Sequence, residues 1–182
     1  MAILGYGDIG ASCARIVKAF GTRIIGVKRR PDQTSDEHRS YCDELVGIDE
    51  LDRVCAEADF FVAVLPETAS TLNFINNETV FSKMKPGAVF MNIGRGTTVN
   101  EIDLVAALKS GQLGGAVLDV FAVEPLPQDS ELWILPNVMM TPHCADQDDD
   151  WLDRAMEIVS ENISNFLANR PLQNLCDKES GY

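Results

Sequence analysis

The chain has 182 residues, a formal net charge of −13 at pH 7 and 46% hydrophobic residues, a size that suits one well-packed domain rather than two. The negative charge argues against nucleic acid or an anionic membrane surface as a partner, and no apolar run approaches the roughly 20 residues that span a bilayer. The N-terminus lacks a signal-peptide pattern and the five cysteines contain no Cys-x-x-Cys pair, which predicts reduced thiols in a cytoplasmic protein. Two distant histidines and scattered cysteines offer no cluster of metal ligands, so no metal site is expected.

Short apolar strands alternate with amphipathic helices along the chain. Strands are expected at 2–6, 23–27, 59–65, 88–93, 114–120 and 138–141. Helices are expected at 8–20, 49–58, 76–84, 101–110 and about 148–168, with Asp49 and Asn100 as N-caps and Gly111 ending the fourth. Nearly continuous apolar strands separated by helices predict a doubly wound α/β domain, with a parallel sheet covered on both faces. His38, in the polar stretch 34–40, is expected to be solvated.

A Gly-x-Gly-x-x-Gly motif, "GYGDIG", connects the first expected strand to the first helix. Gly5 permits a tight turn, Gly7 lets a pyrophosphate approach the backbone, and Gly10 allows the helix to pack closely on the strand. The helix N-terminus adds N–H groups and the positive end of a dipole. This places a dinucleotide at Gly5, Gly7, Asp8, Ile9 and Gly10, in a Rossmann-type domain; the alternative is a Gly-rich turn without a ligand.

The second expected strand ends in three consecutive basic residues, Lys28, Arg29 and Arg30. Enzymes that use NAD usually carry Asp or Glu at this point, to bind the 2′-hydroxyl of the ribose. A carboxylate would repel a 2′-phosphate, whereas guanidinium groups can bind one in a bidentate manner. The triplet therefore favours NADP(H), with NAD possible, over the alternative of a solvated basic loop.

Three polar residues follow other expected strands: Arg95 in "NIGRGTTVNE", Glu124 in "LDVFAVEPLP" and His143 after "VMMTP". Ligands of doubly wound folds bind at this edge of the sheet. An arginine, a carboxylate and a histidine there suit the reduction of a 2-oxo acid: the arginine holds the substrate carboxylate, the histidine donates a proton to the carbonyl oxygen, and the glutamate orients and charges the histidine. Taken separately, each of the three is more often an ordinary surface residue.

At these motifs the sequence resembles the D-isomer-specific 2-hydroxyacid dehydrogenases, with "GYGDIG", "LPETAST", "MNIGRGTTVNE", "GAVLDVFAVEPLP", "LPNVMMTPH" and a closing "GY" in family order. "EPLPQDSELW" looks most like the NADP-preferring glyoxylate/hydroxypyruvate reductases. The resemblance implies that Arg95 binds the substrate carboxylate, that Glu124 is the partner of His143, and that His143 is the general acid/base. It also implies a nicotinamide site formed by Leu65, Pro66, Thr71, Ile93, Gly94, Arg95, Asp119, His143 and Ala145. The implied reaction converts a small 2-oxo acid to the D-2-hydroxy acid.

The resemblance further implies that residues 1–168 are the dinucleotide-binding domain and that 169–182 are a C-terminal tail of a second, substrate domain. The N-terminal part of that domain is expected to be largely absent. A homodimer is implied as well. An alternative function is a dinucleotide-binding module without turnover, which acts through a partner or as a redox-responsive scaffold. The acidic run from Asp146 to Asp150 suits a helix N-terminus but departs from the family pattern, and close to the cleft it would repel an anionic 2-oxo acid.

Overall fold

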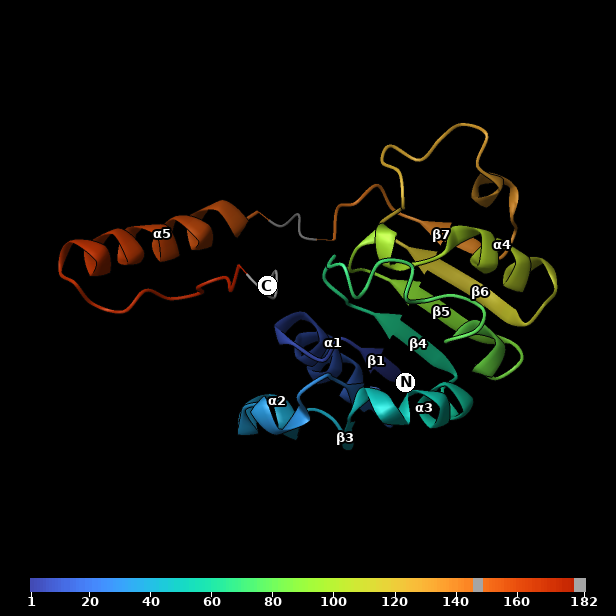
Figure 1. The fold of residues 1–182 in the computed structure, drawn as a ribbon, viewed down its shortest axis with the longest axis horizontal. Coiled ribbons are helices and arrows are strands. Elements are labelled where there is room, and N and C mark those ends of the chain that lie inside the picture. The colour runs from blue at the N-terminus through green and yellow to red at the C-terminus, as the bar shows by residue number, and fades with distance from the viewer. Residues whose placement is uncertain (146–148, 179–182) are drawn as a thin grey trace. The chain divides into compact units, whose positions relative to one another are not determined.

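The computed structural model describes residues 1–145 and 149–178 and divides into two compact units, Met1–Pro142 and His143–Tyr182. The first unit contains a seven-stranded sheet in the order β3-β2-β1-β4-β5-β6-β7, drawn as arrows in Figure 1. All six neighbouring strand pairs are parallel. The strands are β1 (Ala2–Leu4), β2 (Ile25–Val27), β3 (Glu44–Val46), β4 (Phe60–Ala63), β5 (Ala88–Asn92), β6 (Leu113–Leu118) and β7 (Val138–Met140). The predicted doubly wound sheet is confirmed.

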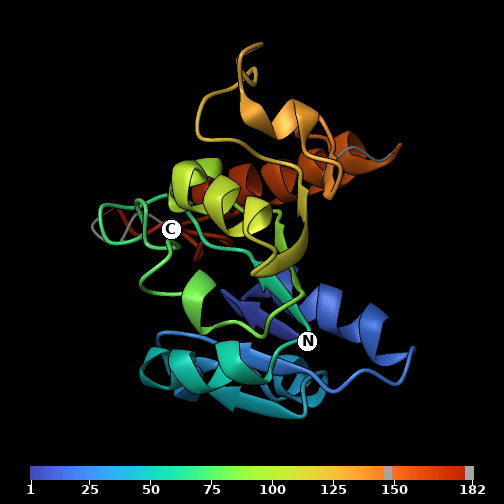
Figure 2. The same ribbon diagram turned by 90° about the vertical axis from the view of Figure 1, so that its right-hand side faces the viewer.

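Helices cover both faces of this sheet. They are α1 (Asp8–Lys18), α2 (Asp36–Ser40), α3 (Leu51–Glu57) and α4 (Glu101–Lys109), together with short 3₁₀ turns at 31–33, 48–50, 81–83, 96–98 and 131–134. The two views in Figures 1 and 2 place α3 and α4 on one side of the sheet and α1 on the other. Strand order reverses between β1 and β4, and the carboxyl ends of strands at such a point are where doubly wound folds bind their ligands.

The helix α1 packs closely on the sheet because its buried face is made of small residues, Gly10, Ala11 and Ala14. Larger apolar residues of the helix point away from this contact, with Ile9 60% and Ile16 58% exposed. The helical spacing of apolar residues predicted the helix correctly. The close approach to β1 depends on the small residues instead.

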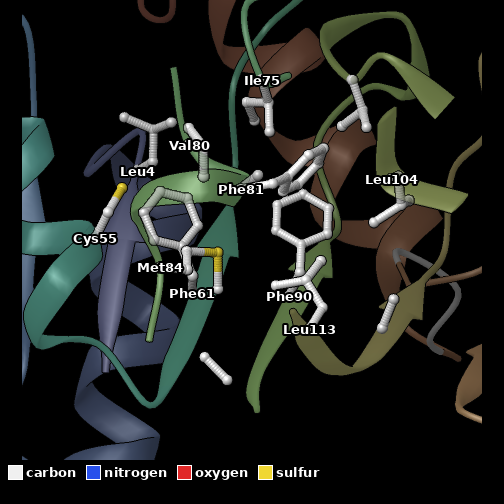
Figure 3. Packing of buried hydrophobic residues seen from close by; sticks show 14 of the residues in the cluster. Leu4, Cys55, Phe61, Ile75, Val80, Phe81, Met84, Phe90, Leu104 and Leu113 are labelled. Atoms are coloured by element: carbon white, nitrogen blue, oxygen red, sulfur yellow. The ribbon is translucent and has the colours of Figure 1, made fainter. Parts of the chain in front are cut away.

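The larger core cluster lies on the α3 and α4 side and is centred on three aromatic rings, shown in Figure 3. Phe90 of β5 contacts Phe81 edge-to-face, with ring centroids 5.3 Å apart, and stacks near Phe61 of β4 at 6.3 Å. All three side chains are 0% exposed. Aromatic pairs of this geometry add to the free energy gained by burying their area, so this cluster anchors the centre of the sheet.

Several local predictions are confirmed and others are wrong. The Asn100 side chain caps α4 by accepting a hydrogen bond from the Asp103 N–H, and Gly111 follows the helix with φ of +77°. Asp49 is not an N-cap, because a 3₁₀ turn begins at Ile48 and α3 continues directly from it. The expected helix at 76–84 is a hydrogen-bonded turn that ends in 3₁₀ geometry at 81–83, since Asn76 accepts from the backbone N–H groups of Glu78 and Thr79 and closes a tight turn instead.

The second unit begins at His143 and contains α5 (Trp151–Leu167) and the segment that follows it. The Asp150 carbonyl accepts from the Arg154 N–H in the first turn, so the helix begins at Trp151, directly after the acidic run and about three residues later than expected. The Asn162 side chain makes two hydrogen bonds to the backbone of Gln173, which fold the C-terminal segment back along the helix. Asp146 and Asp148, and the closing Gly181 and Tyr182, lie outside the described residues. Within the described ranges, no helix has both the length and the apolar character needed to cross a bilayer.

Candidate functional site

The Gly-rich loop joins β1 to α1 at the carboxyl edge of the sheet. Gly5 has φ of +93°, and a Cβ atom there would lie 2.4 Å from the Val64 carbonyl oxygen. A Cβ atom at Gly10 would lie 2.8 Å from the Gly5 carbonyl oxygen. Both contacts are too short for any side chain, so the turn and the close helix packing require these two glycines.

Gly7 differs from the other two glycines of the motif. A Cβ atom built on it would meet nothing within 4 Å. Gly7 is also the N-cap residue of α1, and no side chain caps the helix. The first N–H groups of a helix have no intrahelical acceptor, so this end of α1 offers donors toward space that the protein leaves open. Asp8 and Ile9, in the first turn, are exposed. The loop therefore fits a phosphate group that approaches the backbone at Gly7.

The basic triplet lies directly beside this loop. The backbone N–H groups of Gly5 and Tyr6 both donate to the Val27 carbonyl, at 3.0 and 3.1 Å, and Val27 is the residue before Lys28. The Lys28 N–H donates to the Val46 carbonyl of β3, and the side chains of Arg29 and Arg30 are exposed. The structure thus brings the start of the triplet next to the Gly-rich loop, and its role as a clamp for a 2′-phosphate stays a prediction.

The loops after β4, β5 and β6 are packed backbone against backbone. A Cβ atom at Gly94 would lie 2.7 Å from the Leu65 carbonyl oxygen, and one at Gly96 would lie 1.9 Å from the carbonyl carbon of Phe121. Any side chain at either position would push the loops apart. These two glycines flank Arg95, so they fix its backbone between the segments that carry Leu65 and Phe121.

Arg95 and Glu124 lie on two of these neighbouring loops. Arg95 is exposed, its Nη1 donates to the Gly94 carbonyl at 2.7 Å, and its own carbonyl accepts from the Thr98 hydroxyl at 2.6 Å. Glu124 is also exposed, and its Oε1 accepts from the Phe121 N–H at 2.9 Å. The sequence did not single out Glu101, whose carboxylate accepts from the Ala122 N–H at 2.7 Å and helps to shape the Glu124 loop.

The predicted nicotinamide residues that belong to the first unit lie at the same edge. Thr71 donates through its hydroxyl to the Pro66 carbonyl at 2.7 Å and accepts from the Thr68 N–H at 2.8 Å, which closes the loop after β4. Asp119 is buried at the end of β6, where the Thr141 hydroxyl donates to its carboxylate and its N–H donates to Asn92. Ile93 and Gly94 directly follow β5, the strand beside β6 in the sheet.

His143 is the first residue of the second unit and has φ of +51°. It lies two residues after Thr141 along the chain, with Cys144 and Ala145 beyond it. Each unit is defined by itself, so the structure gathers the Arg95 and Glu124 loops but does not place His143 against them. The predicted role of His143 therefore stays a prediction.

Known proteins supply an independent comparison. The model of the family described as D-isomer specific 2-hydroxyacid dehydrogenase, NAD binding domain, matches residues 1–145. The chain is 36% identical over 180 residues to glyoxylate/hydroxypyruvate reductase A of Salmonella newport (strain SL254). The matched region covers 99% of this chain and 55% of that protein. The chain spans about half the length of the curated relatives it matches.

Two solved structures are similar over the entire chain. One is a D-isomer specific 2-hydroxyacid dehydrogenase from Xanthobacter autotrophicus in complex with NADPH and MES, at 35% identity and a TM-score of 0.90, of which this chain covers 72%. The other is an NADPH-dependent glyoxylate/hydroxypyruvate reductase from Sinorhizobium meliloti in complex with NADP and sulfate, at 34% identity and a TM-score of 0.88, with 56% of that chain covered.

Proposed function

This chain belongs to the D-isomer-specific 2-hydroxyacid dehydrogenases through their NAD-binding domain, and from this premise we propose that it binds NADP(H) and reduces a small 2-oxo acid of the glyoxylate or hydroxypyruvate type. One observation supports the binding most strongly. Gly5 and Gly10 are required by the fold, whereas Gly7 faces open space at the uncapped N-terminus of α1. Approach of a ligand to the backbone explains why that position lacks a side chain.

The preference for NADP(H) rests on Lys28, Arg29 and Arg30. They follow β2 directly beside the Gly-rich loop, where the adenosine ribose of a dinucleotide lies in this fold. Three cations there compensate a 2′-phosphate, and guanidinium groups match its oxygens in pairs. The bound NADP(H) in two similar structures agrees with this proposal.

In the proposed reaction, Arg95 holds the carboxylate of the 2-oxo acid and so orients the carbonyl group. His143 donates a proton to the carbonyl oxygen, and Glu124 orients the imidazole. The reduced nicotinamide supplies the hydride to the carbonyl carbon when it is bound. One hydride and one proton convert the carbonyl group to a hydroxyl group, so the products are the 2-hydroxy acid and the oxidised cofactor. The domain boundary after residue 168, the homodimer and the cytoplasmic location stay predictions.

The experiment is to measure NADPH oxidation by absorbance at saturating glyoxylate or hydroxypyruvate, beside a fluorescence titration of NADPH binding. Turnover together with binding supports the proposal. Binding without turnover supports the alternative of a dinucleotide-binding module, and failure to bind contradicts both. A matched reaction with His143→Gln, which cannot act as an acid, separates enzymatic turnover from background oxidation.

A further inference from the structure

The last turn of α2 contacts both of the loops proposed to bind phosphate groups. The helix is only five residues long and was not expected from the sequence. Two consecutive residues in it, His38 and Arg39, reach in different directions: His38 toward the Gly-rich loop and Arg39 toward the segment after the basic triplet. The expectation that His38 is solvated is met only in part, since its side chain is 28% exposed and lies near Asp8.

Arg39 fixes the segment that carries the basic triplet. Its Nη2 donates to the carbonyl of Pro31 at 2.7 Å, and Pro31 directly follows Arg30. The Arg39 backbone is itself anchored, since its carbonyl accepts from the Cys42 N–H at 3.4 Å and Cys42 is buried. A guanidinium group has five N–H donors in a planar fork, so a bond to Pro31 leaves donors for an anion.

His38 ties the same helix to the Gly-rich loop. Its carbonyl accepts from the hydroxyl of Tyr6, at 3.1 Å, and its Nδ1 lies 3.8 Å from Oδ1 of Asp8. Burial raises the pKa of Tyr6, so the phenol stays protonated and acts as a donor. The Tyr6 ring is 0% exposed and lies against the backbone of Gly26 in β2. The short helix is therefore held in place from the core side.

The surroundings of the basic triplet are otherwise acidic. Asp32, Asp36 and Glu37 lie between the triplet and Arg39, and Glu37 is engaged by the hydroxyl of Tyr41 at 2.9 Å. Because the chain has a net charge of −13, each cation near a bound dianionic phosphate strengthens the binding of that phosphate. The three consecutive basic residues at 28–30 do not reveal in the sequence that a fourth cation, Arg39, follows nine positions after Arg30.

We propose that Arg39 is a specificity-determining residue for the 2′-phosphate of NADP(H). It holds the basic segment through the carbonyl of Pro31 and adds a fourth cation to Lys28, Arg29 and Arg30. His38, beside it on α2, holds the Gly-rich loop, which both NADPH and NADH would use. This inference rests on the proposed binding of NADP(H), and it predicts that Arg39 affects discrimination between the two cofactors rather than binding in general.

The test is to titrate the full chain with NADPH and with NADH, for the wild type, Arg39→Ala, Arg39→Lys and the control Arg15→Ala. Arg15 lies exposed on α1 and is not part of the basic segment, so its loss removes the same charge from the same unit. We expect Arg39→Ala to weaken NADPH about 5- to 20-fold and NADH less than about twofold, because a charged hydrogen bond to phosphate is lost. Arg39→Lys keeps the charge without the planar fork and should recover part of the loss. Arg15→Ala should change either affinity less than about twofold.

Equal weakening of both cofactors by Arg39→Ala would overturn the inference, as would a change no larger than that of Arg15→Ala. Thermal melting of each variant shows whether the fold is kept, and the partial recovery in Arg39→Lys keeps the result interpretable if Arg39→Ala is less stable. If the wild type binds neither cofactor, the proposed function fails together with this inference. If the wild type binds NADPH and Arg39→Ala binds it equally well, only the inference fails.

Discussion

Replacement of Gly7 by alanine separates a glycine kept for a ligand from glycines kept for the fold. The added Cβ atom would meet no atom within 4 Å in the protein itself. Gly7 has φ of −101°, which alanine can adopt. The loss of a favourable N-cap residue and the reduced entropy of the unfolded chain each amount to about 0.5 to 1 kcal/mol and have opposite signs. The free energy of unfolding of Gly7→Ala should thus stay within about 1 kcal/mol of the wild type.

Binding should respond very differently. A methyl group between the backbone and a pyrophosphate overpacks the contact, and overpacking costs about 1 to 3 kcal/mol. That range corresponds to an affinity for NADPH that is roughly 5- to 150-fold lower. Gly5→Ala is the matched control for the fold: positive φ costs about 1 to 2 kcal/mol, and the clash with the Val64 carbonyl adds a further 1 to 3 kcal/mol or so.

The assay combines urea unfolding with a fluorescence titration of NADPH. We expect Gly7→Ala to unfold near the wild-type midpoint and to bind NADPH weakly, and Gly5→Ala to unfold at clearly lower urea. Wild-type affinity in Gly7→Ala would refute the reasoning, because the open space at Gly7 would then have no connection with a ligand. A large loss of stability in Gly7→Ala would also refute it.

Three further predictions address the substrate, the core and pH. Arg95→Ala should lower kcat/KM for glyoxylate by roughly 30-fold or more, since a charged hydrogen bond is worth about 2 kcal/mol, while the Kd of NADPH changes less than about twofold; an equal loss of cofactor affinity would contradict its role. Phe90→Ala should lower the free energy of unfolding by about 3 to 5 kcal/mol, against less than about 0.5 kcal/mol for the exposed Ile16→Ala; similar losses in the two would count against the aromatic cluster. The N–H of Ile24 donates to Asp43 at 2.8 Å and, with Lys18 nearby, lowers the pKa of Asp43 below 3.8. The stability that the Asp43 carboxylate contributes is therefore fully present above that pH and is lost as pH falls through the lowered pKa. Urea midpoints from pH 5 to pH 3 should therefore fall more steeply in the wild type than in Asp43→Asn, and parallel curves would show that the carboxylate is not linked to folding.

Much of the central sheet could be predicted because each buried strand reads as an apolar run. The expected strands at 88–93 and 138–141 match β5 and β7 within one or two residues. The strand β3 was missed because its sequence, Glu44–Val46, is short and begins with a charged residue at the edge of the sheet. The helix α2 was missed because its residues are all polar, and it is stabilised by the Ser35 cap and by the tertiary bond from Tyr6.

The candidate site was predictable where it depends on short motifs. The three glycines of "GYGDIG" and the triplet at 28–30 are local in sequence, and they meet because β1 and β2 are neighbours. The support around Arg95 was not predictable, since the contacts of Gly94 with Leu65 and of Gly96 with Phe121 join residues about 25 to 30 positions apart. Arg39 and Glu101 escaped notice because each makes a hydrogen bond to a backbone carbonyl or N–H group, eight and 21 positions away, that sequence motifs do not mark.

The most direct test of the account is a calorimetric titration of the wild-type chain with NADPH and with NADH at the same ionic strength. The open backbone at Gly7 and the cations after β2 predict that both bind and that NADPH binds at least about tenfold more tightly. Tighter binding of NADH would contradict the assignment of the basic segment to a 2′-phosphate. Failure of both to bind would contradict the central claim that this edge of the sheet is a dinucleotide site.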